Sequence, residues 1–128
     1  MKKGICAMLL VLGMGSAYAD DLVCVYQAEI SVDDKYNSSG EFLATGYTKN
    51  AVAAVIRQDR ANFYKFNPGG DPNDSPGCVF QSQNRRAYLE KLVRKSRLSP
   101  QVIRRIIDEN PVIEVQVYSK SVRIEIVE

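Results

Sequence analysis

Two cysteines, Cys24 and Cys78, constrain this chain more than any other feature. The third cysteine, Cys6, lies in an N-terminal segment that we expect to be removed. An even pair of cysteines in a small exported domain is typical of a disulfide bond. We therefore predict a Cys24–Cys78 bond that joins the start of the domain to a point past its middle.

The N-terminal segment has the three parts of a bacterial signal peptide. Lys2 and Lys3 form a basic head, residues 5–12 form an apolar run too short to remain as a membrane span, and residues 15–19 end in Ala-Tyr-Ala. We predict that residues 1–19 are cleaved and that residues 20–128 form a single domain. The expected location is the periplasm, with secretion beyond the outer membrane as an alternative and no stable membrane anchor.

The composition argues against most catalytic chemistry. The chain has 128 residues and no histidine, which excludes Ser-His-Asp triads, Cys-His pairs and most zinc sites. It has no CxxC motif and no glycine-rich phosphate loop. We predict a protein that is not an enzyme and that needs no metal or cofactor. The remaining catalytic alternative is a small carboxylate-based peptidoglycan hydrolase that uses Glu29, Glu41 and Asp59.

The first half of the chain predicts a hairpin followed by a helix. Residues 22–32 alternate apolar and polar side chains, residues 33–40 are rich in turn formers, and residues 41–47 suggest a returning strand. Thr48 can cap a helix whose apolar face contains Ala51, Val52, Val55 and Ile56. A buried strand over residues 51–57 is the alternative. The aromatic residues 63–66 suggest a further short strand.

Residues 67–77 predict an irregular loop, because prolines and glycines recur through it. Its polar side chains suggest a calcium site, but an EF-hand beginning at Asp71 needs glycine and glutamate where this chain has Pro76 and Ser82. We therefore expect no metal there. A long loop in a small domain is often functional, so its polar residues are one candidate for partner binding: Asp71, Asn73 and Asp74.

The second half predicts two helices and a hairpin. Asn84 can cap the first helix, whose apolar face contains Tyr88, Leu89, Leu92 and Val93, and Ser99-Pro100 opens the second. Residues 112–127 form two alternating segments around a turn at Ser119-Lys120. That register pairs Val117 with Val122, Val115 with Ile124, Ile113 with Ile126, and Glu114 with Glu125.

These elements define the expected fold class. We predict a small single α+β domain in which two β-hairpins share one antiparallel sheet. Two to three helices pack on one face of that sheet, and one disulfide joins its parts.

Charge divides the expected mature domain in two. Lys2 and Lys3 leave with the signal peptide, so the remainder carries equal numbers of basic and acidic residues, which argues against nucleic acid as a partner. The acidic residues dominate before position 85 and the basic residues after it. A run of basic residues on the two helices is the second candidate for partner binding: Arg85, Arg86, Lys91, Arg94, Lys95, Arg97, Arg104 and Arg105.

From these features we predict a non-catalytic periplasmic protein-binding module. The specific version is an inhibitor or immunity-type protein that occludes an envelope-targeted toxin or hydrolase, with a partner whose surface is acidic. The alternative is an accessory subunit of a secretion, conjugation or pilus apparatus. The alternative for the basic run is that it is simply the solvent-exposed face of an amphipathic helix and binds no partner. The sequence does not determine the oligomeric state.

Overall fold

The computed structural model describes residues 20–72 and 78–128 of the chain. It confirms a small α+β fold. The elements, in chain order, are β1 (Leu22–Glu29), a short 3-10 helix η2 (Val32–Lys35), α2 (Lys49–Phe66), α3 (Gln83–Lys95), α4 (Pro100–Asp108), β2 (Val112–Tyr118) and β3 (Val122–Ile126).

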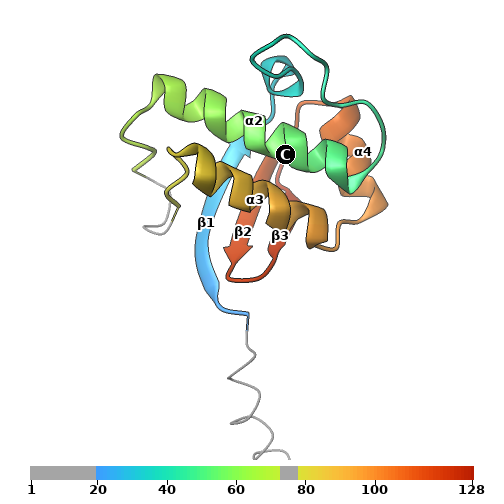
Figure 1. The fold of residues 1–128 in the computed structure, drawn as a ribbon. Helices are drawn as coiled ribbons and strands as arrows, with labels where there is room; N and C mark the ends of the chain where they lie inside the picture. Colours follow the sequence, from blue (N-terminus) through green and yellow to red (C-terminus); the bar gives the residue numbers. More distant parts are fainter. Residues whose placement is uncertain (1–19, 73–77) are drawn as a thin grey trace, which may run out of the picture.

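The three strands form one antiparallel sheet in the order β1-β2-β3. Helices α2 and α3 lie side by side across one face of this sheet, and α4 lies toward the β3 side (Figure 1). The core forms between these layers, where alternate residues of the strands meet the apolar faces of the helices. Its largest fully buried apolar side chains come from both layers: Tyr26, Ile30, Ile56, Leu89, Ile106 and Ile113. None of the described helices is long and apolar enough to cross a membrane.

The C-terminal hairpin has the predicted register. Val117 lies opposite Val122, Val115 opposite Ile124, and Ile113 opposite Ile126, and all but the partly buried Ile126 are in the core. Glu114 lies opposite Glu125, as expected. Alternation of apolar side chains was sufficient here because a shift of one residue would place every buried side chain in water.

The predicted first hairpin is wrong. Residues 41–47 form no strand, and only an isolated bridge joins Tyr36 to Phe42. The partner of β1 is instead β2, from the far end of the chain. The chain leaves the sheet after Ile30 and turns into η2, where Asp34 accepts a hydrogen bond from the backbone N–H of Ser31. The β1–β2 pairing joins residues distant in sequence, which local patterns do not reveal.

Residues 51–57 belong to helix α2, so they form the predicted helix and not the alternative buried strand. Thr48 caps α2, because its hydroxyl oxygen accepts a hydrogen bond of 3.0 Å from the backbone N–H of Ala51. The helix continues to Phe66, so the predicted short strand over residues 63–66 is wrong. Phe63 and Tyr64 continue the helix and pack near Arg60.

The two later helices begin close to the predicted positions. Ser82, rather than Asn84, caps α3 and accepts a hydrogen bond of 3.1 Å from the backbone N–H of Arg85. Ser99 caps α4 as predicted, and Pro100 occupies its first turn. Both serine and asparagine are good N-caps, so the residue types alone did not select between neighbouring candidates.

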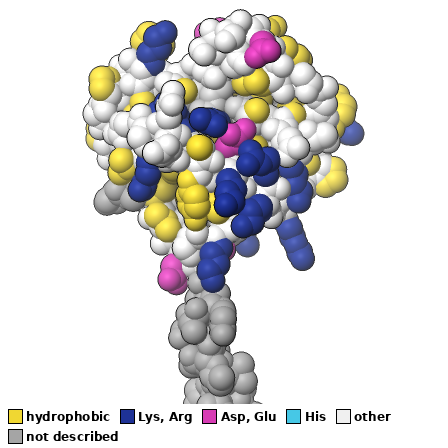
Figure 2. Space-filling view, in the orientation of Figure 1, with side chains coloured by type: hydrophobic (Ala, Val, Ile, Leu, Met, Phe, Trp, Pro, Cys, Tyr) yellow, Lys and Arg dark blue, Asp and Glu magenta, His cyan; other side chains and the backbone are white. Residues whose placement is uncertain are grey.

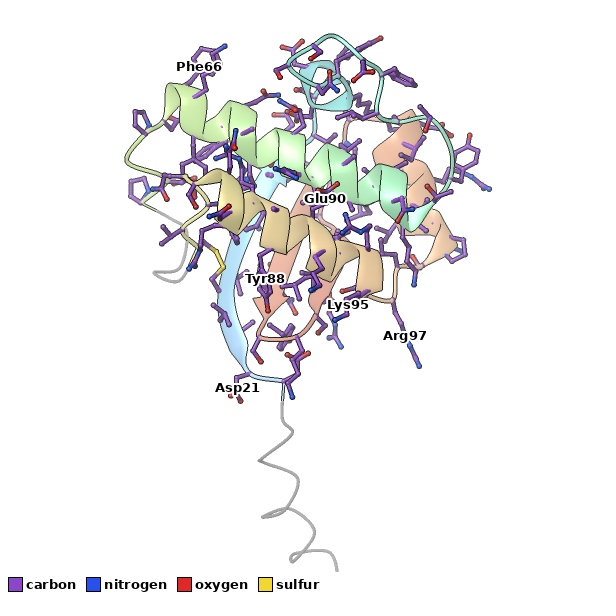
Figure 3. All side chains as sticks on the ribbon, viewed as in Figure 1. Asp21, Phe66, Tyr88, Glu90, Lys95 and Arg97 are labelled. Carbon is purple, nitrogen blue, oxygen red and sulfur yellow. A yellow bond between two sulfur atoms is a disulfide. The ribbon has the colours of Figure 1, made fainter. Side chains whose placement is uncertain are left out.

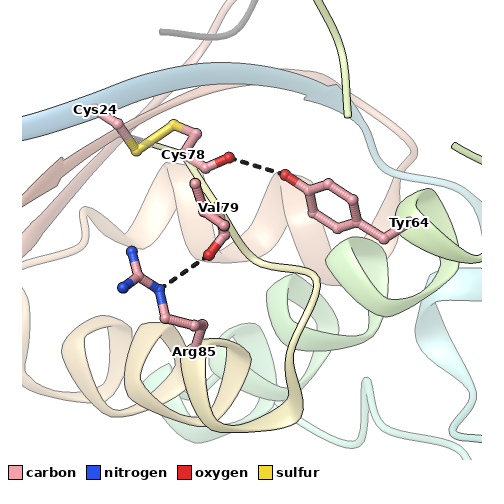
Figure 4. The surroundings of a disulfide bond; sticks show 5 residues. All are labelled: Cys24, Tyr64, Cys78, Val79 and Arg85. Carbon is pink, nitrogen blue, oxygen red and sulfur yellow. Dashed lines mark hydrogen bonds between the residues drawn. A yellow bond between two sulfur atoms is a disulfide. The ribbon is translucent and has the colours of Figure 1, made fainter. Parts of the chain in front are cut away.

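The predicted disulfide is present between Cys24 in β1 and Cys78, and both cysteines are buried. Their Cα atoms are 5.3 Å apart, a separation typical of a disulfide. Two further interactions hold the segment that follows Cys78 (Figure 4). The Tyr64 hydroxyl donates to the carbonyl of Cys78 at 3.0 Å, and Arg85 Nε donates to the carbonyl of Val79 at 3.0 Å. The bond therefore ties β1 to the segment leading into α3.

Ser96 joins the end of α3 to β3. Its buried hydroxyl donates to the carbonyl of Leu92 and accepts from the backbone N–H of Val122, each at 2.7 Å. We expect Ser96→Ala to lower the free energy of unfolding by about 1–3 kcal/mol, because it leaves a buried N–H without an acceptor. Chemical denaturation measures this, with the exposed serine variant Ser39→Ala as a control. A Ser96→Ala loss no larger than that of the control would show that another acceptor replaces the hydroxyl.

Candidate functional site

The exposed side of α3 combines apolar and basic side chains. Leu89, Leu92 and Val93 turn into the core, so the residues between them face outward. A stripe at helical spacing runs along the outer side: Asn84, Tyr88, Lys91 and Lys95. Figure 2 shows Lys and Arg side chains gathered over α3, beside hydrophobic side chains. The helix thus presents a mixed surface rather than a purely solvated one.

Three basic side chains at the C-terminal part of α3 and just beyond it are available to a partner. Lys91, Lys95 and Arg97 are exposed, and within residues 20–72 and 78–128 their side chains form no ion pair or hydrogen bond. Arg94 lies 3.4 Å from Glu90, which also accepts from Arg57 at 2.8 Å. Glu90 therefore partly neutralises Arg94, whereas Lys91, Lys95 and Arg97 have no ionic partner among the described residues.

The other predicted basic residues of α3 have a structural role. Arg86 donates to the carbonyls of Phe80 and Gln81, at 2.9 Å and 2.7 Å, while Arg85 binds the carbonyl of Val79. These bonds dock the segment after the disulfide onto the first turn of α3. Arg85 and Arg86 are consequently less free to bind a partner than the sequence suggested.

The two basic residues of α4 engage neighbours of their own. The Arg104 guanidinium lies 5.6 Å from the centre of the Tyr47 ring, and Arg105 Nε lies 2.6 Å from Glu109. The Tyr47 hydroxyl donates to Asp108, which also raises the pKa of Tyr47. Because both basic residues of α4 are engaged by neighbours, we restrict the candidate site to α3 and the residues just after it.

An apolar groove of about 370 Å³ adjoins the basic side of α3. Tyr88 lines it and is 49% exposed, although the sequence suggested that Tyr88 belongs to the buried face. Its hydroxyl donates to the carbonyl of Ser119 at 2.8 Å, which fixes the ring beside the sheet. The pairing of β1 with β2 is irregular between Leu22 and Cys24. Val23, the residue between them, lines the groove. The other lining residues are Phe80, Asn84, Arg85, Val117, Tyr118 and Ser119.

Figure 3 shows how these features are arranged along the helix. Tyr88, Lys95 and Arg97 lie on the same side of α3, and Glu90 lies toward α2. We call the surface formed by Tyr88, Lys91, Lys95 and Arg97, together with the apolar groove, the α3 face. Periodicity could have found it, because Tyr88 and the two lysines recur at helical spacing.

The predicted binding loop is only partly described. Asp71 lies within the described residues and is half-buried, whereas Asn73 and Asp74 lie outside them. In residues 20–72 and 78–128, no three cysteine or carboxylate side chains gather closely enough to hold a metal ion. We therefore take the α3 face, whose residues are all described, as the candidate site.

A second, polar groove of about 930 Å³ lies between η2, the end of β1 and the second half of α2. Glu29 and Asp59, two of the three carboxylates considered for catalysis, both line it. Glu41 does not, and its side chain accepts a hydrogen bond from Asn37. The sequence did not indicate the partner of Asp59: Asp34, a buried carboxylate of η2.

Comparisons with protein-family models, with curated proteins and with solved structures found no match to this chain.

Proposed function

We propose that this protein is a non-catalytic protein-binding module and that the α3 face is its binding surface. The observation that carries the proposal is the combination of free cations with an apolar groove. Lys91 and Lys95 lie further along the same helix as Tyr88, which lines the groove together with Phe80, and Arg97 follows the end of that helix. Tyrosine and arginine are enriched among residues that dominate binding energy at protein interfaces.

The chemistry of the α3 face favours one kind of partner. The groove can accept an apolar side chain, and the ammonium and guanidinium groups further along α3 and just after it complement carboxylates on the same partner. Complementary charge of this kind increases the association rate and selects among partners. The expected ligand is therefore a protein surface that presents an apolar residue within an acidic patch.

The expected signal peptide supports a location in the cell envelope. There, the specific version of the proposal is an inhibitor or immunity-type protein that covers an envelope-targeted toxin or hydrolase. The alternative within the same class is an accessory subunit of a secretion, conjugation or pilus apparatus. The neighbouring genes distinguish the two, because a toxin gene supports the first and an apparatus operon supports the second.

A different class of function rests on the polar groove. Glu29 and Asp59 line the same cavity, and burial raises the pKa of Asp59 to about 7, which is suitable for a general acid. A carboxylate-based peptidoglycan hydrolase is therefore the weaker alternative. Loss of activity on purified peptidoglycan in Glu29→Gln, with wild-type activity present, would support it.

Charge reversal tests the binding proposal. We expect Lys95→Glu combined with Arg97→Glu to weaken partner binding at least about tenfold, because attraction to the acidic patch becomes repulsion. Pull-down from a periplasmic extract identifies the partner, and titration with the purified partner measures the affinity. Arg123→Glu is a matched control, since Arg123 is an exposed cation on β3, on the strand positions that face away from the helices.

Two outcomes would contradict the proposal. One is the absence of any stoichiometric partner in the extract. The other is an equal loss of affinity in the double variant and in Arg123→Glu, which would show that net charge matters and the α3 face does not.

A further inference from the structure

The polar groove has a floor of buried charged groups that the proposed binding function does not use. Asp34 in η2 and Asp59 and Arg60 in α2 are 4%, 6% and 2% exposed, and all three line the groove. Charged side chains are almost never buried to this extent unless they are paired. The arrangement of these three groups determines what the groove can bind.

The two carboxyl groups of the floor are close enough to influence each other. Asp34 accepts from Asn62 at 2.8 Å, and Asp59 accepts from Arg60 Nε at 2.8 Å. Burial raises the pKa of Asp59 to about 7, opposed by Arg60 and reinforced by the nearby Asp34. Below about pH 7, therefore, Asp59 is largely protonated and its carboxyl group can donate as well as accept a hydrogen bond.

Arg60 is held rigidly but keeps hydrogen-bonding capacity. Its guanidinium carbon lies 4.1 Å from the centre of the Tyr26 ring and 4.5 Å from that of Phe63, so aromatic rings pack against the planar group. Its Nε donates to Asp59 at 2.8 Å. This is the only hydrogen bond of the Arg60 side chain within residues 20–72 and 78–128, so the donors on its two terminal nitrogens are left for a ligand.

The walls add neutral polar groups and aromatic rings. Gln58 donates to Asn62 at 2.9 Å, and Asn62 donates to Asp34 at 2.8 Å, which forms a chain of amides leading to the floor. Tyr36 and Phe66 also line the groove and are 43% and 77% exposed. Figure 3 shows Phe66 at the end of α2, far from Arg97 of the α3 face.

We propose that this groove binds a neutral, polyhydroxylated ligand, an oligosaccharide segment. Each hydroxyl group of such a ligand both donates and accepts, which matches a floor where carboxylate acceptors lie beside guanidinium donors. The apolar faces of sugar rings can pack on Tyr36 and Phe66. Arg60 and Lys65 disfavour a cationic ligand, and Glu29 and Asp33 disfavour an anionic one.

A titration followed by two-dimensional amide NMR tests this inference, with the neutral tetra-N-acetylchitotetraose as the probe and the purified protein near pH 6. We expect binding with a dissociation constant of about 1 mM or tighter. The amide signals that shift should belong to residues 27–38 and 58–67. Signals of α3 should stay unchanged, which separates this result from the proposed protein-binding function.

Three variants keep the test decisive. Phe66→Ala removes an exposed ring and Gln58→Ala removes an amide of the wall, and each should weaken binding at least threefold. Tyr88→Ala, in the α3 face, should leave binding unchanged. Arg60→Met should abolish binding, but this buried substitution also threatens folding, so the two wall variants decide the test.

Several results would overturn the inference. The first is the absence of any shift at about 10 mM tetra-N-acetylchitotetraose, a concentration well above the expected dissociation constant. The second is a set of shifts that persists in both wall variants. The third is a set of shifts in the same residues with a lysine-rich peptide but not with the saccharide. The last result would assign the groove to a cationic ligand.

Discussion

Removal of the Cys24–Cys78 bond is expected to lower the free energy of unfolding by about 4 kcal/mol in the chain-entropy model. The bond closes a long loop, with a sequence separation of 54, and both sulfurs lie in the core. A small domain has a total stability of only about 5–15 kcal/mol. We therefore expect the double variant Cys24→Ser/Cys78→Ser to unfold at a much lower denaturant concentration than the oxidised protein.

The same bond should matter for binding by the α3 face. Cys78 leads directly into Phe80, which lines the apolar groove, and into the carbonyls that bind Arg85 and Arg86. Denaturation with and without reductant measures the stability effect, and the double variant is the control because reductant cannot act on it. An unchanged unfolding midpoint in the double variant would contradict the stability prediction. Normal partner affinity in a folded double variant would show that the bond stabilises the fold but does not affect binding.

Stability should fall as the pH rises from about 4 to about 7, through the titration of Asp59. Burial is the chief reason that the pKa of Asp59 rises from its ordinary value of 3.8 to about 7 in the folded state. Between these values the folded state binds more protons than the unfolded state. The free energy of unfolding therefore decreases with pH, by at most about 1.4 kcal/mol per pH unit for one group. Asp34 and Arg60 are the charged groups that face Asp59.

Asp59→Asn tests this assignment. Asparagine resembles the protonated carboxyl group and can still accept the bond from Arg60 Nε, so we expect the stability of the variant to depend far less on pH in this range. Chemical denaturation at several pH values measures the slope. Glu41→Gln, an exposed carboxylate that accepts a bond from Asn37, is the control and should keep the wild-type slope. A wild-type slope in Asp59→Asn would assign the pH dependence to other groups.

Local patterns predicted much of the fold. The hairpin register from Ile113 to Ile126, the caps at Thr48 and Ser99, and the buried position of Cys24 follow from neighbours within a few residues of one another. The first hairpin failed for the opposite reason. The strand β1 pairs with β2 near the other end of the chain. The alternation over residues 41–47 is a local pattern, so it could not indicate that β1 has a better partner elsewhere.

The candidate site was predicted less completely. The sequence identified the cations of α3, but it could not show that Arg85 and Arg86 bind backbone carbonyls while Lys91 and Lys95 stay free. Tyr88 was assigned to the core because an apolar stripe on a helix does not reveal where the neighbouring sheet ends. Only the packing leaves that ring at the rim of a groove.

The sequence by itself determined the disulfide partners, because a single pair of cysteines follows the expected signal peptide. It also determined the α+β class, because hydrophobic periodicity distinguishes helices from strands over short segments. The tertiary structure alone decided that Asp34, Asp59 and Arg60 meet in one buried cluster. Asp34 and Asp59 come from separate elements, and no periodic pattern marks a charged residue that packing has removed from water. The same packing joins the Cys24–Cys78 bond to the segment that leads into α3, so that the bond supports the face we propose for binding.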